Sequence, residues 1–262
     1  MKHVLLSLAL FASVAVFADE IESSNVIGVL PVTSSAKRTI VSVPWCAMSA
    51  TDNAAIQVSN IVKTANLTAG DMLYYVQSNG EYTAWRLSDT EVKYWESVNI
   101  ASDKSVTVSE DAHDQTIARG NSIILVRQNP GTAESPNTFY IYGQVGTSDA
   151  TVSTAVVQGS SVSPAYTLIA APSAAAWNLN DITWTGAGEN DQISVPLANG
   201  YVKTLTFSGG KWGSNEPALD SETHMTKYTW TQYSTAIPAG QGVWYVSFGG
   251  NPTISWSSVP VK

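Results

Sequence analysis

The chain has 262 residues, of which 44% are hydrophobic, 10% aromatic and only 13% charged. Acidic residues outnumber basic ones by 21 to 13, giving a net charge of −8. This balance argues against nucleic acid as a partner, since binding to phosphates needs a basic face. The nine tryptophans and eleven tyrosines argue against a disordered chain. The length fits two ordinary domains or one large all-β domain.

The N-terminus has the pattern of a secretory signal peptide. Met1 to His3 form a short basic segment, residues 4–17 are apolar, and small residues stand at Val16 and Ala18. The apolar run is too short to span about 30 Å of hydrocarbon, so we prefer this reading to a membrane anchor or a buried helix. We expect residues 1–18 to be removed, leaving an exported protein that is periplasmic, cell-surface or extracellular. No later run of 18 apolar residues predicts a transmembrane span.

Cys46 is the only cysteine, which excludes an intramolecular disulfide. It follows the predicted strand end at residues 41–45, and only two histidines lie beyond residue 18. We therefore predict a buried, inert thiol rather than a nucleophile. An exported protein without disulfides is typical of bacterial proteins whose cores are large enough to be stable without them.

Alternation of apolar and polar residues with period two recurs along the chain, and helical periodicity is scarce. The alternating segments are rich in Val, Ile, Thr, Tyr and Trp, and clusters of Gly, Asn, Ser and Pro separate them. The predicted strands cover residues 72–77, 82–87, 122–127, 138–142, 192–197, 201–207, 227–233, 242–248 and 253–256. This pattern predicts an all-β fold with little helix.

Two hairpins are predicted from Asn-Gly dipeptides between alternating segments. Asn79-Gly80 and Asn199-Gly200 each supply the two residues of positive φ that a type I′ turn requires. The two dipeptides are 120 residues apart. The same offset relates residues 118–126 to 238–246, and an offset of 128 relates 39–44 to 167–172.

These ordered matches predict internal duplication rather than chance similarity of turns. We expect two tandem antiparallel β-sandwich or barrel-like domains, at residues 19–146 and 150–262. Residues 146–149 are predicted to form the joint, a short linker between the two domains. Each unit is long enough to bury its own core, which favours two domains over an open repeat array.

Motifs for chemistry are weak. His113 and His224 lie in acidic loops, but they do not align at the offset of 120, so solvated loops are preferred to a metal site. No GxSxG elbow and no glycine-rich phosphate loop followed by a helix is present. We predict no cofactor, no metal and no enzymatic activity. An exported hydrolase remains an alternative, because the separation of two carboxylates depends on the fold.

Aromatic residues suggest a second alternative, since exported β modules stack sugar rings on exposed Trp and Tyr faces. Filling of the interior is the competing interpretation. The turn-adjacent residues Trp95, Trp212 and Tyr201 are the candidates for glycan stacking. The segment 228–233 also places Tyr228 and Trp230 on one face of a Thr-rich strand, which could pair edge to edge with another copy.

The segments Tyr166–Pro172 and Pro238–Val246 resemble bacterial secreted β-repeat proteins of unknown function, whose strands have the form "YNLISLP" and "agrGyWv". Residues 39–44 and 118–126 carry the resemblance more weakly, because the first copy has Ile123-Ile124 where the second has Val243-Trp244. The resemblance covers most of the mature chain and implies export and β architecture. We expect a non-enzymatic envelope or extracellular protein acting in surface assembly or adhesion, with itself, other surface proteins or glycans as partners.

Overall fold

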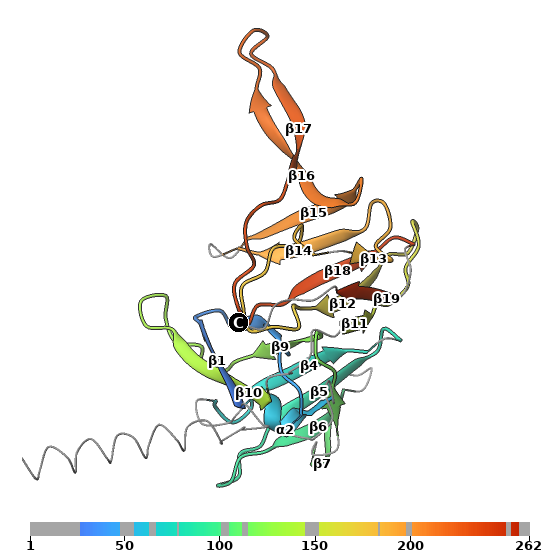
Figure 1. The fold of residues 1–262 in the computed structure, drawn as a ribbon. Coiled ribbons are helices and arrows are strands. Elements are labelled where there is room, and N and C mark those ends of the chain that lie inside the picture. The colour runs from blue at the N-terminus through green and yellow to red at the C-terminus, as the bar shows by residue number, and fades with distance from the viewer. Residues whose placement is uncertain are drawn as a thin grey trace, which may run out of the picture.

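The structure is a computed structural model that describes residues 27–47, 55–62, 67–77, 79–100, 105–111, 115–144, 152–182, 184–197, 201–249 and 253–256. The expected signal peptide, the joint at 146–149, His113 and the Asn199-Gly200 dipeptide lie outside these residues. The fold is all-β, as the sequence predicts. It contains two separate six-stranded antiparallel sheets, one in each half of the chain (Figure 1).

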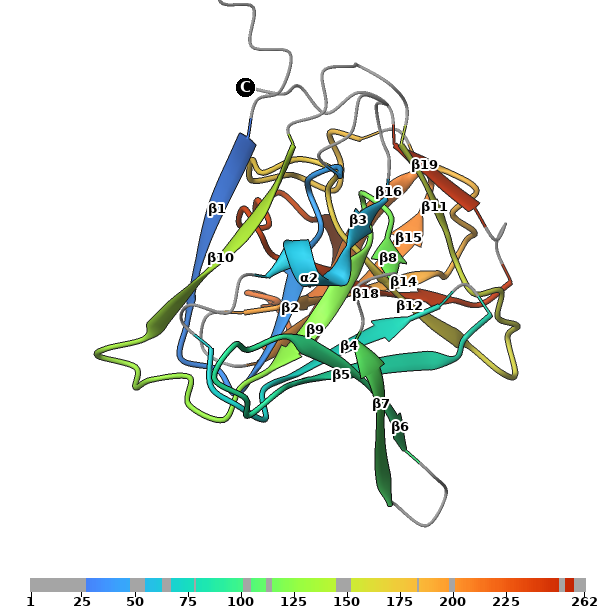
Figure 2. The same cartoon turned by 90° about the horizontal axis from the view of Figure 1, so that it is seen from below.

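The first half contains one six-stranded sheet and two short strand pairs. In spatial order the sheet consists of β2 (Arg38–Ser42), β9 (Ser122–Val126), β4 (Met72–Val76), β5 (Tyr82–Leu87), β6 (Trp95–Ile100) and β7 (Val106–Asp111). The short pairs are β1 (Ile27–Ser34) with β10 (Asn137–Gln144) and β3 (Ile56–Gln57) with β8 (Thr116–Ile117). Figure 2 shows the one-turn helix α2 (Val58–Ile61) between these two pairs.

The second half repeats the spatial order of the large sheet. Its strands are β12 (Ala165–Ile169), β18 (Val243–Ser247), β14 (Gln192–Pro196), β15 (Val202–Ser208), β16 (Lys211–Leu219) and β17 (Thr226–Gln232). A three-stranded sheet of β11 (Val152–Ala155), β19 (Thr253–Trp256) and β13 (Trp184–Thr185) accompanies it. In both halves the sheet strand that comes first in the chain lies at one edge and pairs with the sheet strand that comes last in the chain. A hairpin, β6–β7 or β16–β17, forms the opposite edge.

Each half has its own hydrophobic core. In the first, Trp85 and Trp95 of the large sheet belong to the same cluster as Phe139 of β10 and Ile61 of α2. The large sheet and the smaller elements therefore form two layers around one core. The second core is centred on Trp212, which contacts Phe207, Tyr245 and Trp184 through tilted or edge-on ring packing. Cys46 is buried, as predicted.

The two large sheets meet along a seam of reciprocal backbone contacts. Ser42 N–H donates to the Gly240 carbonyl at 2.9 Å, and Ala170 N–H donates to the Gly120 carbonyl at 3.0 Å. Residues 42 and 170 differ by the offset of 128, and residues 120 and 240 by the offset of 120. The adjacent antiparallel bridges obey the same two offsets: Val41 with Gln241, and Ile169 with Asn121. The seam therefore contains two equivalent sets of contacts.

Further hydrogen bonds reinforce the seam. Ser122 Oγ donates to the Ile169 carbonyl at 2.7 Å, and Arg119 Nε donates to the Pro172 carbonyl at 2.7 Å. Both bonds are buried, so each is made where water does not compete with it. The sheets are thus joined at their inner ends, while β7 and β17 lie at opposite ends of the molecule (Figure 1).

The predicted type I′ turn at Asn79-Gly80 is wrong. Gly80 has a φ of +85°, but Asn79 is not among the described residues of positive φ. Gly80 N–H donates to the Gln77 carbonyl at 2.9 Å and Gln77 N–H to the Glu81 carbonyl at 2.8 Å. These bonds define a three-residue loop that ends in a left-handed glycine, which moves the strand register by one residue.

The second hairpin has the same register in its described strands. Pro196 pairs with Val202 as Val76 pairs with Tyr82, at the offset of 120. Leu197 N–H donates to the Tyr201 carbonyl at 2.8 Å, which corresponds to the Gln77–Glu81 bond. The two hairpins therefore differ from the predicted two-residue connection in the same way.

Candidate functional site

The three aromatic residues predicted to stack on glycans do not form one site. Trp95 and Trp212 are 1% and 0% exposed, so the expectation that their rings face solvent is wrong. Both lie beside turns, but their side chains point from the sheet into the core. Trp95 Nε1 donates to the buried carbonyl of Val62 at 3.3 Å. Tyr201 is 73% exposed, and neither predicted tryptophan presents a ring face beside it.

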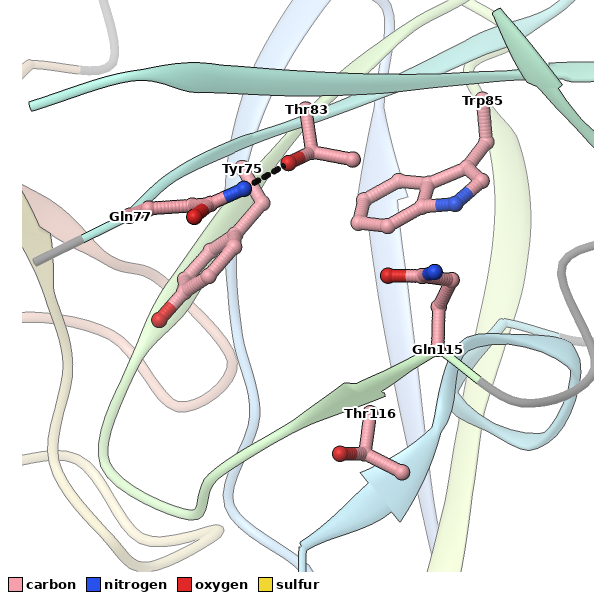
Figure 3. Close-up of a pocket in the computed structure, with 6 residues that line it drawn as sticks. All are labelled: Tyr75, Gln77, Thr83, Trp85, Gln115 and Thr116. Atoms are coloured by element: carbon pink, nitrogen blue, oxygen red, sulfur yellow. Dashed lines mark hydrogen bonds between the residues drawn. The ribbon is translucent and has the colours of Figure 1, made fainter. Parts of the chain in front are cut away.

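A small pocket lies in the first half, on the face of β4 and β5 (Figure 3). Its volume is about 260 Å³, and it is lined by Tyr75, Gln77, Thr83, Trp85, Gln115 and Thr116. Gln77 Nε2 donates to Thr83 Oγ1 inside it. Burial raises the pKa of Tyr75, which keeps its hydroxyl protonated over the physiological range. The lining thus offers neutral hydroxyls, amides and the half-buried ring of Tyr75, whereas Trp85 is buried beneath them.

Buried carboxyl groups occur at equivalent places in the two halves. Asp71 accepts backbone N–H bonds from Thr68 at 2.9 Å and Gln128 at 2.6 Å. At the offset of 120, Asp191 accepts from Gly188 at 2.8 Å and Phe248 at 2.7 Å. Each carboxyl group therefore fixes a turn before a hairpin to a segment after the neighbouring strand.

The residues that accompany these carboxyl groups differ between the halves. The Tyr245 hydroxyl donates to Asp191, and Tyr245 is 1% exposed. Burial, followed by this hydrogen bond and the charge of Asp191, raises the pKa of Tyr245. In the first half, burial lowers the pKa of Arg127 while the charge of Asp71 opposes that change. Asp71 and Asp191 are aligned at the offset of 120 in the sequence, but nothing in the sequence marks them as buried.

Metal-ligand side chains do not gather in the described part of the chain, where no group of three His, Cys, Asp or Glu side chains could hold an ion. His224 lies in the loop that joins β16 to β17, with a φ of 57°. In the same loop the Asp220 carboxylate accepts from Thr223 N–H at 2.8 Å and Glu222 N–H at 3.0 Å. These bonds, both accepted by Oδ1, lower the pKa of Asp220.

The most exposed element is the hairpin of β16 and β17, which we call the arm and define as residues 214–232. It extends from the body of the second half (Figure 1). All seven residues of β17 are exposed, and so are residues 221–225 of the connecting loop. No residue of the arm belongs to either hydrophobic core cluster, so the arm gains little stability from burial of apolar side chains.

The two faces of the arm differ in character. Opposite residues in an antiparallel pair lie on the same face, so Trp230, Tyr228 and Thr226 share a face with Asn215, Pro217 and Leu219. On this apolar face Leu219 is 70% exposed, Tyr228 67% and Trp230 40%. The other face carries Ser214, Glu216, Ala218, Lys227, Thr229 and Thr231. The arm is therefore an amphipathic ribbon whose apolar side is uncovered.

Contacts at its base hold the arm in place. Lys203 Nζ lies 2.7 Å from Glu216 Oε1 and 5.8 Å from the centre of the Tyr233 ring. The hydrogen bonds from Lys203 and Ser214, together with the charge of Lys203, lower the pKa of Glu216. On the apolar side, a Cβ at Gly213 would lie 2.5 Å from the Trp230 ring, so only glycine admits the indole there.

Comparison with family models finds no match for this chain, and comparisons with curated proteins and with solved structures find none either. Among the described residues, no helix has the length and apolar character needed to cross a membrane.

Proposed function

We propose that this protein is a non-enzymatic component of the bacterial envelope or extracellular space, which assembles or adheres through the apolar face of its arm. The observation that carries the proposal is the exposure of Leu219, Tyr228 and Trp230 on one side of a projecting ribbon. Large apolar side chains that lie side by side in water mark contact surfaces, because a partner that covers them releases ordered water. The hairpin is already formed, so binding costs it little conformational entropy.

Export and duplication belong to the same proposal. The N-terminal pattern supports secretion with a mature start at Asp19, and the low fraction of charged residues eases association between surfaces. The equal strand orders, the reciprocal seam and the paired Asp71 and Asp191 networks support descent of the two halves from one unit. In the described residues, the corresponding strands of the first half, β6 and β7, are shorter than β16 and β17 and carry no aromatic residue except the buried Trp95.

The test of the proposed function removes the apolar face and keeps the strand. In the double variant Tyr228→Thr/Trp230→Thr, β propensity and backbone groups are retained while both rings are lost. The exported protein should then move from the sedimentable envelope or surface fraction to the soluble fraction of the producing cells. The control, Thr229→Val/Thr231→Val, changes the opposite face of the same strand and should keep the wild-type distribution. Equal distributions for both variants would show that the apolar face is not the contact.

Carbohydrate binding is a second candidate, favoured by the pocket in Figure 3. Hydroxyl and amide groups beside the half-buried ring of Tyr75 match the hydroxyls and an apolar face of a sugar ring. At the offset of 120, the positions of Tyr75, Gln77 and Trp85 hold Val195, Leu197 and Leu205. The pocket therefore belongs to the first half alone.

The carbohydrate test uses a glycan array followed by calorimetric titration with the sugars that bind. Gln115→Ala removes an exposed amide of the pocket and should abolish or strongly weaken binding. Tyr201→Ala, which removes an exposed ring outside the pocket, should leave the affinity unchanged. Binding that survives Gln115→Ala but not Tyr201→Ala would place a sugar at Tyr201 instead.

A further inference from the structure

The outer edge of the arm has a definite pattern of backbone groups. Tyr233 N–H donates to the Trp212 carbonyl at 2.9 Å, and Asp220 N–H donates to the Met225 carbonyl at 2.9 Å. In an antiparallel pair the residues that point toward the partner strand alternate with those that point away. The odd-numbered residues of β17 therefore bond to β16. The backbone groups of Thr226, Tyr228, Trp230 and Gln232 point away from β16, toward the outer edge.

The two free edges of the arm are not equivalent. By the same alternation, the backbone of Pro217 faces away from β17, so the β16 edge lacks an N–H donor at its middle. Strand β17 contains no proline, and Lys227 is its only charged residue. Proline, charge and short length are the usual devices that keep edge strands from pairing. The β16 edge has such a device, whereas β17 is a seven-residue template for another strand.

We propose that β17 pairs with β17 of a second copy, antiparallel and centred on Thr229. This pairing rests on the proposed role of the arm as the contact site. In this register Tyr228 lies opposite Trp230 of the other copy, and both have outward-facing backbone groups, so each such pair can exchange two hydrogen bonds. Thr226 and Gln232 form the other pairs of this kind. A register displaced by one residue would place outward groups opposite inward ones and lose these bonds.

The side chains fit the same register. Lys227 lies opposite Thr231 of the other copy, so no like charges meet. Tyr228 and Trp230 form two cross-strand aromatic pairs, and the two apolar faces join on one side of a four-stranded ribbon. Because each copy offers the same strand, the contact has twofold symmetry. A pairing of this length is small beside the roughly 1,600 Å² of a standard interface, so we expect dimers that dissociate on dilution.

Cysteine cross-linking tests the register. In the proposed dimer Thr229 meets its own copy as a non-hydrogen-bonded pair, with Cα atoms about 4.5 Å apart, which suits a disulfide. Under mild oxidation of concentrated mature protein, Thr229→Cys should give severalfold more covalent dimer than Thr231→Cys. Thr231 is an exposed residue of the same face and strand, but in this register it lies opposite Lys227. Both variants retain the buried Cys46, which is therefore a constant background.

Analytical ultracentrifugation provides an independent measurement. Thr226→Pro removes an outward N–H and should weaken the concentration-dependent dimer, whereas Thr226→Ala keeps that N–H and should not. Equal cross-linking of the two cysteine variants, or a wild-type protein that stays monomeric at high concentration, would overturn the pairing. If the aromatic double variant still leaves the surface fraction in that case, the arm contacts a different partner and only the self-pairing fails.

Discussion

Asp191 and Tyr245 show how one buried polar pair can hold a hairpin base together. The carboxyl group accepts two backbone N–H bonds and the tyrosine hydroxyl, and the equivalent position of Tyr245 in the first half is Leu125. Buried polar groups contribute to stability only when their partners are present. The second half therefore depends on a hydroxyl that the first half does without.

The Tyr245→Phe variant should lower the free energy of unfolding by about 1–2 kcal/mol at neutral pH, because Asp191 loses a buried donor. The folded-state pKa of Tyr245 is raised, so its contribution is complete below the unfolded pKa of about 10 and declines as the pH rises above it. Urea unfolding at a series of pH values should show the wild-type advantage shrinking above that point. Tyr82→Phe, at an exposed ring, serves as the control and should match wild type throughout.

At the scale of elements, the described part of the loop in the β4–β5 hairpin has one residue of positive φ rather than the two that a type I′ turn requires. Gly80 has positive φ, whereas Asn79 contributes through its side chain, whose Oδ1 accepts from Glu81 N–H at 2.9 Å. A Cβ at Gly80 would meet only Val157 Cγ1 at 3.5 Å, an ordinary contact. The need for glycine is therefore conformational and not steric.

Gly80→Ala should cost about 1–2 kcal/mol, the usual penalty for a side chain in the left-handed region. Asn79→Ala should cost less, because it loses exposed hydrogen bonds without backbone strain. Chemical denaturation of both variants measures the difference. Equal losses of unfolding free energy in the two variants would instead support the two-residue turn that the Asn-Gly dipeptide suggested.

Strands with regular alternation were predictable, whereas a strand interrupted by glycine and proline was not. The bounds of β5 and β19 agree with prediction, β4, β9 and β14 end one residue earlier, and β18 is one residue shorter at each end, because Val, Ile and Tyr alternate there. Strand β16 was missed since it contains Gly213 and Pro217, residues that are rare in strands. Its pairing with β17 tolerates them because Pro217 faces the free edge and Trp230 needs the space at Gly213.

The candidate site was predictable only in part. The strand containing Tyr228 and Trp230 was predicted, and its aromatics do share one face. The burial of Trp95 and Trp212 was not, because a position beside a turn does not determine which face of the sheet a side chain occupies. The pocket joins β4, β5 and the segment at Gln115, which only the tertiary fold brings together.

At the scale of the whole molecule, the seam makes each half a part of the other's environment. Ala174 and Ala239 of the second half pack against the first core, and Gly240 lies against Leu30 and Val32. Contacts of this kind couple unfolding, so calorimetry of Gly80→Ala should show one transition shifted as a unit. Two transitions, with only the first displaced, would mean that the halves unfold separately.

The strand at the other end of the molecule bears on how many copies can join. Pairing between β6 and β7 is interrupted by a register shift between Glu96 and Ser97, and such an irregularity twists an edge away from would-be neighbours. A molecule with one receptive end and one protected end has a valency of one. If β17 strands pair as proposed, growth stops at two copies, and the product is a closed dimer instead of a fibre.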